Sequence, residues 1–313
     1  MADDNEQHLR WGVRRRLEFI DFRLFWEGRF NRKALADGFG ISSQQASADI
    51  AQYESMAPDN LSYDAALKAY VRTANFKPRF IGQSTDRFLL QLAAIESDWM
   101  RKEDSWFDAL PPAEVVGLSS RKTDPGHLLA VLDAIRNRLE LKVEYHSMTG
   151  SAAPARTIAP HALAHSKGRW YARSWSREHN DFRDYSLNRI QRVFDPRPCP
   201  VDPKLDFEWA HTINLILVPN PALTEERQKA VAGEYEMTNG ERKVPTRLSL
   251  SFYLMSEFNL DVEEGKLAPE KQQLILNNRT EVEQARAAAR QMSKEALARG
   301  PRVTTQPSPL ARP

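Results

Sequence analysis

The sequence predicts an α+β protein built from several domains. Three observations support this fold class. At 313 residues the chain is too long for one small core. Apolar residues recur at helical spacing in the first 60 positions, whereas alternation typical of strands begins after about residue 140. Two stretches rich in proline, residues 110–126 and 195–200, then divide the chain into segments.

The composition indicates a soluble globular protein of a reducing compartment. Hydrophobic residues make up 41% and charged residues 27% of the chain. No apolar run reaches the length of a membrane span, and the acidic start is not a signal peptide, so we expect a cytoplasmic protein. The single cysteine, Cys199, excludes an internal disulfide framework and a four-cysteine zinc site. The net charge of +2 does not decide the partner, because a DNA-binding protein needs only a local basic face.

The first 80 residues predict three helices followed by a hairpin. A helix from Glu6 to Gly28 is indicated by an apolar stripe, and Asn31 caps a short helix that the residues 38–42 interrupt. The third helix opens with Ser42 and Gln45, a capping-box pattern in which each side chain satisfies the other residue's backbone donor. Two short strands flank a turn at residues 64–66. The stripe of the first helix consists of Leu9, Val13, Leu17, Ile20 and Leu24.

This order of elements is that of a winged helix-turn-helix, which we assign to residues 1–80. If Ala46, Ile50 and Tyr53 form the buried edge of the third helix, rotation by about 100° per residue turns Gln44, Ser47, Ala48 and Ala51 outward. That face is small enough to enter a major groove, where a glutamine amide pairs with adenine. The expected DNA contacts are Arg15, Arg32, Ser43, Gln44, Gln45, Ser47 and Lys68, with further phosphate contacts from Arg14, Arg16 and Lys33.

Two alternatives remain for this segment. Instead of binding DNA, it could be a helical bundle that binds nothing, or a module that docks other proteins. The basic residues of the segment are nearly offset in charge by five acids, which favours specific docking over general coating of DNA. These acids are Asp37, Asp49, Glu54, Asp59 and Asp64. Retention on DNA that weakens steeply with salt separates these possibilities.

The remaining segments are assigned as follows. Residues 81–125 form a helical linker with a helix at residues 85–100, whose apolar set is Phe88, Leu89, Leu92 and Ile95. Residues 126–198 contain a helix and then strands at residues 141–147, 169–175 and 182–187, and residues 199–212 form a second linker. Residues 213–282 form a small α+β domain with strands at 213–218 and 246–253 and a helix at 224–232. Residues 283–313 form a helical and then disordered tail.

The motif Gly168-Arg-Trp-Tyr-Ala172 resembles the WYL domain of bacterial transcriptional regulators. Flanking motifs at residues 145–147, 158–161 and 187–190 lie in the order that this family shows. The N-terminal motifs at residues 14–21, 26–32 and 39–42 resemble the subgroup of regulators found beside the anti-phage defence systems BREX and CBASS. One departure is Ala172, where the family has a larger residue.

The resemblance implies an SH3-like β-barrel at residues 126–198 that senses an effector. It also implies a C-terminal extension that supports dimer contacts or gates the effector pocket. Strand parity adds Arg173, because Tyr171, Arg173 and Trp175 share one face of a strand, and arginines beside tyrosines suit phosphates and stacked bases. The effector residues implied by the resemblance are Tyr145, Ser147, His161, Tyr171, Arg183 and Arg189. The alternative is that these arginines pair with Glu178, Asp181 and Asp184 on a solvated sheet.

We therefore expect a homodimer that binds double-stranded DNA at an inverted repeat and represses its own phage-defence locus. A nucleotide or nucleic-acid effector on the WYL domain would release it, and no cofactor, metal or membrane is expected. His161 and His165 lack the third ligand and the glutamate of a zinc-protease motif, and catalytic loops are missing, so we do not expect an enzyme. The competing functions are those of an activator with the same architecture and of a module that binds only proteins.

Overall fold

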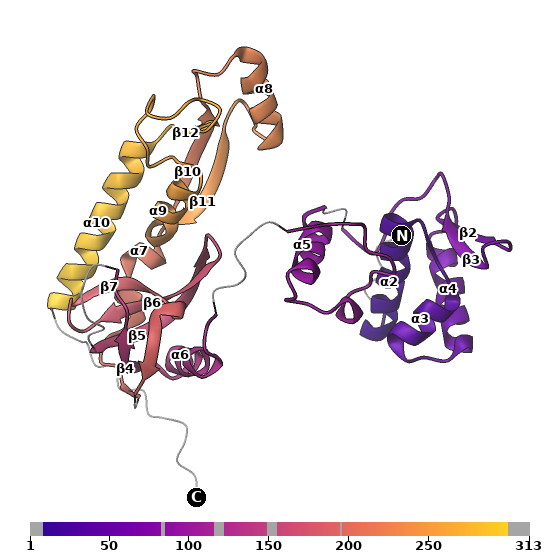
Figure 1. The fold of residues 1–313 in the computed structure, drawn as a ribbon, viewed down its shortest axis with the longest axis horizontal. Coiled ribbons are helices and arrows are strands. Elements are labelled where there is room, and N and C mark those ends of the chain that lie inside the picture. Colours follow the sequence, from indigo (N-terminus) through magenta and orange to yellow (C-terminus); the bar gives the residue numbers. More distant parts are fainter. Residues whose placement is uncertain (1–8, 83–84, 116–121, 149–154, 195, 300–313) are drawn as a thin grey trace, which may run out of the picture. The chain divides into compact units, whose positions relative to one another are not determined.

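The computed structural model describes residues 9–82, 85–115, 122–148, 155–194 and 196–299 (Figure 1). The chain divides into two compact units, Met1–Ser119 and Ser120–Pro313, and each unit is described by itself. In the described part of the chain, no helix is both long and apolar enough to cross a membrane.

The first unit is built around helix α2 (Trp11–Glu27). Three members of the predicted stripe, Leu17, Ile20 and Leu24, are fully buried, and Leu9 and Val13 pack against the same core. The helix ends at Gly28, whose φ of 76° lies in the left-handed region that glycine adopts without strain. The predicted helix is confirmed from Trp11 to Glu27, and the part predicted at residues 6–8 lies outside the described residues.

Two shorter helices complete the helix-turn-helix. Helix α3 (Arg32–Phe39) is capped by the Asn31 side chain, and helix α4 (Ser43–Met56) by the Ser42 hydroxyl, which accepts from the Gln45 backbone N–H at 3.1 Å. The reciprocal half of the predicted capping box is wrong, because the Gln45 side-chain oxygen does not accept from the Ser42 N–H, and the Gln45 amide nitrogen donates to Asp49 at 3.1 Å. The Gln45 amide therefore pairs with the buried Asp49 carboxylate, one turn along the helix.

The wing is a three-stranded sheet in the order β1-β3-β2, made of β1 (Arg29–Phe30), β2 (Leu61–Asp64) and β3 (Ala69–Arg72). Strand β1 was not expected from the sequence. The turn lies at residues 65–68, not at 64–66, because the Asp64 carboxylate accepts from the backbone N–H groups of Ala66 and Leu67. Leu67 consequently lies in the turn and is 53% exposed.

The segment after the wing packs against α2. Helix α5 (Thr85–Glu96) places Phe88 between Trp26 and Phe107, with ring centroids 4.4 and 4.9 Å away. Leu92 is buried, whereas Leu89 is 57% exposed, so its assignment to the apolar set was wrong. Arg23 of α2 also pairs with Asp108 at 3.0 Å. The part of the predicted linker as far as Asp108 is thus joined to the helix-turn-helix.

The second unit begins with helix α6 (Pro125–Asn137) and a bent antiparallel sheet. Its strand order is β7-β6-β5-β4-β8, with β9 paired to the end of β4. Within the described residues the edge strands β7 and β8 do not pair, so the expected barrel is not closed. Strand β8 spans four residues and pairs with β4, with a register shift between Glu144 and Tyr145. Strand β7 pairs only with β6 among the described strands and is therefore a free edge. The strands are β4 (Leu139–Tyr145), β5 (Ala155–Ser166), β6 (Arg169–Ser176), β7 (Asp181–Ser186), β8 (Ile190–Val193) and β9 (Arg197–Pro198).

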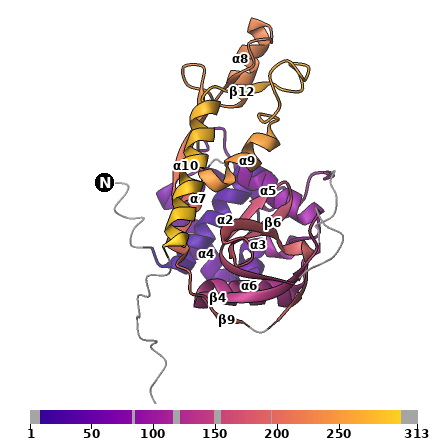
Figure 2. The same ribbon diagram turned by 90° about the vertical axis from the view of Figure 1, so that its left-hand side faces the viewer.

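Helices cover both faces of this sheet. On one face, Val131 and Ala134 of α6 pack with Leu141, Val143 and other sheet residues in one core. On the other face, Trp175 and Phe182 pack with Leu297 from helix α10 (Arg279–Ala298). Both views show α10 running from the C-terminal sheet down to this second face, past the short helix α7 (Phe207–Ala210) (Figures 1 and 2).

The C-terminal sheet has the order β11-β10-β12. The strand predicted at residues 246–253 is wrong beyond Arg247, because Leu248–Glu257 forms helix α9. The alternation of leucine and serine here imitates a strand, yet the buried residues Leu248, Ser251 and Met255 are spaced as in a helix. The predicted helices after Thr224 and from Glu281 are confirmed as α8 and α10. The elements not yet given bounds are β10 (Thr212–Pro219), α8 (Glu225–Glu234), β11 (Arg242–Arg247) and β12 (Leu274–Leu276).

Candidate nucleic-acid interface and ligand-binding face

Helix α4 presents a small polar face to solvent. Ala46, Ile50 and Tyr53 are buried, as predicted from the rotation per residue. Gln44 is exposed in the first turn, and Ser47 is half-buried one turn later. The other exposed residues of this face are Ser43, Gln45, Ala48 and Ala51. Short side chains over two turns allow the helix to approach the floor of a groove.

Arg32 is held beside this face by hydrogen bonds. Its Nη1 donates to the Ser47 hydroxyl at 3.1 Å, and that hydroxyl donates to the Ser43 carbonyl oxygen at 3.0 Å. The structure therefore joins three of the predicted DNA-contacting residues into one polar surface at the start of α4. A guanidinium at this place is suited to a phosphate next to the groove.

The arginines of α2 are engaged within the protein. Arg16 binds the buried Asp49 carboxylate at 2.6 and 3.1 Å, which fixes α4 against α2. Arg15 pairs with Glu18 at 2.7 Å, and its guanidinium lies 4.4 Å from the centre of the Trp106 ring. Arg14 also pairs with Glu18, at 3.3 Å. These contacts give the arginines a role in packing. Lys68, in contrast, is exposed at the wing turn.

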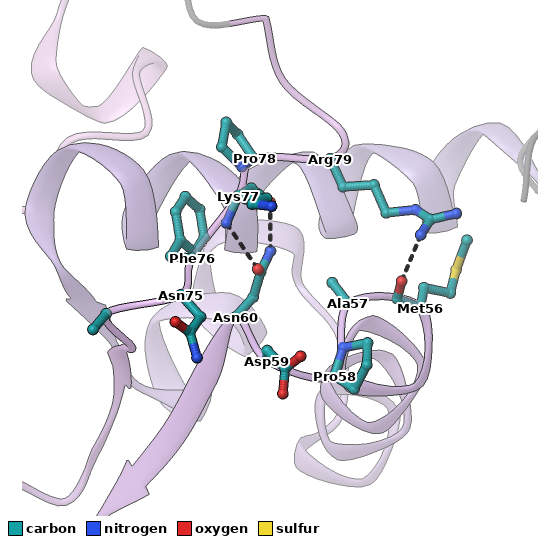
Figure 3. A pocket seen from close by; sticks show the side chains of 11 residues that line it. Met56, Ala57, Pro58, Asp59, Asn60, Asn75, Phe76, Lys77, Pro78 and Arg79 are labelled. Carbon is teal, nitrogen blue, oxygen red and sulfur yellow. Dashed lines mark hydrogen bonds between the residues drawn. The ribbon is translucent and has the colours of Figure 1, made fainter.

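A hollow of about 680 Å³ lies between the loop after α4 and the loop after β3 (Figure 3). Asn60 ties the loops together, since its amide donates to the Lys77 carbonyl at 2.7 Å and accepts from the Lys77 N–H at 2.9 Å. Behind it, buried Asp21 accepts the backbone N–H groups of Arg79, Phe80 and Ile81. Burial nevertheless raises the pKa of Asp21. These bonds set the position of the segment that follows the wing.

The register of the second unit's sheet separates the predicted effector residues into two faces. Arg173 pairs with Asp184 and Ala172 with Tyr185 across β6 and β7. Paired residues share a face and neighbours alternate, so Tyr171 and Arg173 lie opposite to Arg183 and Tyr185. The strand register therefore does not place all seven predicted residues on one face, although Arg173 and Arg183 line one cavity at the sheet edge.

One face carries Tyr145, Arg183 and the nearby Arg189. Tyr145 is buried, its hydroxyl accepts the Ser186 N–H at 3.1 Å, and its ring meets Tyr185 edge-on at 5.1 Å. Arg183 is exposed and Arg189 half-buried, and neither forms an ion pair with a described residue. The Arg189 carbonyl accepts the His146 N–H, next to half-buried Ser147. Guanidinium groups without a carboxylate partner among the described residues are available to an anion.

The other face holds a buried ionic cluster around Arg173. Its guanidinium binds Asp206 at 2.7 and 3.0 Å, Glu208 at 3.3 Å and Asp184 at 3.5 Å. Burial lowers the pKa of Arg173, but the carboxylates outweigh this and raise it. Burial alone would raise the pKa of Asp206. Hydrogen bonds from His161, at 3.0 Å, and from Arg173 outweigh this effect and hold the pKa of Asp206 below its ordinary value. Arg173 and His161 thus serve this cluster.

Asp206 and Glu208 were missed by the sequence reasoning. They lie in the segment predicted to be a linker, 33 and 35 residues after Arg173, and only acids near the arginines were considered. The signal that was available is Asp206-Phe-Glu-Trp209, two acids that alternate with aromatic residues shortly before a strand. Tyr171 also has an unexpected partner, the Tyr253 ring of α9 at 5.0 Å. Among the described residues no group of three or more His, Cys, Asp or Glu is arranged to hold a metal ion.

Family models match three segments of the chain. Residues 12–94 match the winged helix-turn-helix domain of the BrxR transcriptional regulator, residues 126–194 the WYL domain, and residues 212–282 the C-terminal dimerization domain of BrxR. These matches include α4 with the wing, the bent sheet, and the C-terminal sheet respectively.

Relatives align along almost the whole chain, and several are described as the DNA-binding transcriptional repressor CapW. The protein from Stenotrophomonas maltophilia is 34% identical over 91% of this chain and 95% of its own length. The protein from Escherichia coli strain KTE188 is 35% identical over 90% and 94%, and that from Pseudomonas aeruginosa 36% identical over 88% and 92%. A solved structure of proteasome accessory factor B/C from Arthrobacter aurescens aligns at 15% identity over 91% of this chain and 48% of that longer chain. Its TM-score of 0.22 is too low to inform the fold.

Proposed function

This chain belongs to the family of CapW DNA-binding transcriptional repressors, and from that premise we propose that it represses an anti-phage defence locus by binding an inverted repeat as a homodimer. The observation that carries the proposal is the exposed polar face of α4 beside Arg32, within a segment that matches a transcriptional regulator's winged helix domain. The match of residues 212–282 to a dimerization domain supports the two-fold assembly. Two copies double the length of sequence that is read.

Each predicted DNA contact has a proposed role except Arg15, which is engaged by Glu18 and Trp106. Gln44 reads a base edge, while Ser43, Ser47 and Arg32 contact phosphates around the start of α4. Gln45 is in part engaged by Asp49, so its role is to hold the helix as much as to contact DNA. Lys68 at the wing turn contacts the backbone of the neighbouring groove.

We further propose that a nucleotide or nucleic-acid effector binds the second unit and releases the protein from DNA. Arg183 and Arg189 are the contacts we assign, because they are free of carboxylate partners among the described residues. Tyr145 and Ser147 support that face. Arg173, His161 and Tyr171 instead hold the sheet to the helices behind it. An effector changes the equilibrium only through its differential affinity for the two states.

The test measures DNA binding and release separately. Footprinting on the protein's own upstream region is expected to show a protected inverted repeat, and a reporter from that promoter is expected to rise when the protein is deleted. Changing Arg183 and Arg189 together to Ala should leave operator affinity nearly intact and abolish induction. Arg→Lys at either position should weaken induction less than Ala, because lysine cannot contact two phosphate oxygens with one planar group.

Arg192→Ala is the matched control, since Arg192 is exposed on β8 and pairs with Glu144. A reporter that falls on deletion would indicate an activator. If the folded double variant loses DNA affinity in a salt-dependent manner, these arginines contact DNA and the effector assignment is wrong.

A further inference from the structure

A cavity of about 330 Å³ lies in the second unit, where strand β7 faces helices α9 and α10. This volume is within the range of sites that hold small ligands. Strand β7 belongs to the segment that matches the WYL domain, whereas α10 begins at Arg279 and extends past the end of the dimerization match at residue 282. The strand register directs Arg183 to the other face of the sheet, but β7 is an edge strand and Arg183 still lines the cavity. The other residues that decide its chemistry are Ser249, Phe252, Arg286 and Arg290.

Two buried donors in the wall have no hydrogen-bond acceptor among the described residues. They are the Nε of Arg286 and the hydroxyl of Ser249, a residue that is only 6% exposed. Buried polar groups are almost always paired, so each such group calls for an explanation. An anion in the cavity would supply acceptors to both.

The carboxylates in the same wall are already engaged. Asp184 accepts from the Tyr253 hydroxyl at 3.1 Å and from Arg173 at 3.5 Å, and Glu208 accepts from Arg173 at 3.3 Å. Arg173 thus shares its single positive charge among these two carboxylates and Asp206. Arg290 pairs with Asp181 at 3.3 Å and is 49% exposed, while Arg183 and Arg286 have no ion-pair partner among the described residues. Among the charged side chains that line the cavity, four are arginines and two are carboxylates.

An aromatic surface lies beside these donors. Phe252 lines the cavity and is 49% exposed, which is unusual for a phenylalanine inside a folded unit. Its ring lies 5.8 Å from that of Tyr253. An exposed aromatic ring close to arginines is the arrangement on which a nucleobase stacks while its phosphate is bound.

We propose that this cavity binds a nucleoside phosphate, with its phosphate on Arg286, Arg183 and Ser249 and its base on Phe252. The proposal rests on the effector-sensing part of the proposed function and adds the helix α10 to the site. Because residues of both β7 and α10 line the cavity, the ligand would bridge the WYL segment and the helix that begins at the end of the dimerization segment. Binding would then be able to change how these two parts pack.

The experiment is isothermal titration calorimetry of the full-length protein with thymidine monophosphate, thymidine and inorganic phosphate. We expect thymidine monophosphate to bind and both fragments to bind at least about tenfold more weakly, since each lacks one set of contacts. Arg286→Ala should weaken thymidine monophosphate at least about tenfold, and Ser249→Ala should weaken it as well. Lys294→Ala, an exposed cation on the same helix outside the cavity, should bind like the wild type.

Three results would overturn the proposal. The first is no binding of thymidine monophosphate at millimolar concentration, and the second is equal affinity in the Arg286→Ala and Lys294→Ala variants. The third is inorganic phosphate binding as tightly as the nucleotide. Arg189 does not line the cavity, so it separates this idea from the proposed function. If Arg189→Ala abolishes binding and Arg286→Ala does not, the effector occupies the opposite face of the sheet. The repressor function then stands without this cavity.

Discussion

At the scale of single residues, position in the fold decides what an arginine does. Arg173 lies on β6 and pairs across the sheet with Asp184, the residue next to Arg183 on β7. Arg173 is buried among three carboxylates, whereas Arg183 is exposed. Strand parity correctly placed Tyr171 and Arg173 on one face. Parity has no information about partners from distant segments, so it did not reveal Asp206, Glu208 or Tyr253.

Gln44 is the residue on which specific DNA recognition is expected to depend. Gln44→Ala should cost about 1–3 kcal/mol of specific binding and relax the preference at one base position, because a bidentate amide contact is lost. A mobility-shift series with single-base operator variants measures both effects. Gln91→Ala on α5 is the control and should leave both unchanged. Unaltered affinity and preference in Gln44→Ala would remove this residue from the recognition set.

Asp206 is expected to dominate the stability of the ionic cluster. Asp206→Asn should lower the free energy of unfolding by about 3–5 kcal/mol, because it leaves buried Arg173 without its main counter-charge. The pKa of Asp206 is depressed in the folded protein. Its contribution is therefore present above the unfolded pKa near 3.8 and is lost as the pH falls through the lower folded value.

Urea unfolding between neutral and acidic pH measures this contribution. The difference between wild type and Asp206→Asn should shrink as the pH falls below about 4. Asp133→Asn, an exposed partner of Arg136, should show a small change at every pH. A constant difference between wild type and Asp206→Asn across this range would contradict the proposed charge interaction.

At the scale of elements, caps and periodicity predicted the helices well and the short or ambiguous segments poorly. Asn31 and Ser42 marked the starts of α3 and α4 because each cap satisfies a specific backbone donor. Strand β1 has only two residues, which is too short for any periodicity. Helix α9 was mistaken for a strand because its buried serines obscure the apolar spacing.

The cap of α4 offers an element-scale prediction. Ser42→Ala should lower the free energy of unfolding of the first unit by about 1 kcal/mol, since the Gln45 N–H loses its acceptor. Operator affinity should fall as well, because the first turn carries the proposed DNA contacts. Ser43→Ala is the matched control for stability, being exposed and outside the cap. Equal stabilities of the two variants in chemical denaturation would show that the cap contributes nothing measurable.

At the scale of the whole molecule, the sequence predicted the successive domains. It did not predict that the edge strands of the sheet in the second unit stay unpaired, so that the barrel is not closed. The strand motifs were sufficient for recognising the WYL segment, whereas closure depends on whether β7 reaches β8. The pairing of edge strands depends on contacts between strands that local alternation does not encode, and here β7 and β8 are joined by the 3-10 helix Leu187–Arg189 without pairing.

The full chain is expected to be a two-fold dimer with and without DNA. Static light scattering at micromolar concentration should report about twice the 35.8 kDa of one chain. The C-terminal sheet is the expected contact, because residues 212–282 match a dimerization domain. A monomer under both conditions would contradict the proposed reading of an inverted repeat.

The ionic cluster around Arg173 also bears on how this protein can be recombined with its relatives. A chimera joined near residue 199 would take Arg173 and His161 from one parent and Asp206 and Glu208 from the other. Any mismatch would bury an uncompensated charge at the junction. A junction near residue 120, where the two compact units meet along the chain, leaves all four groups in the same parent. Exchange of sensory specificity between repressors is therefore expected to succeed by transplanting the second unit whole.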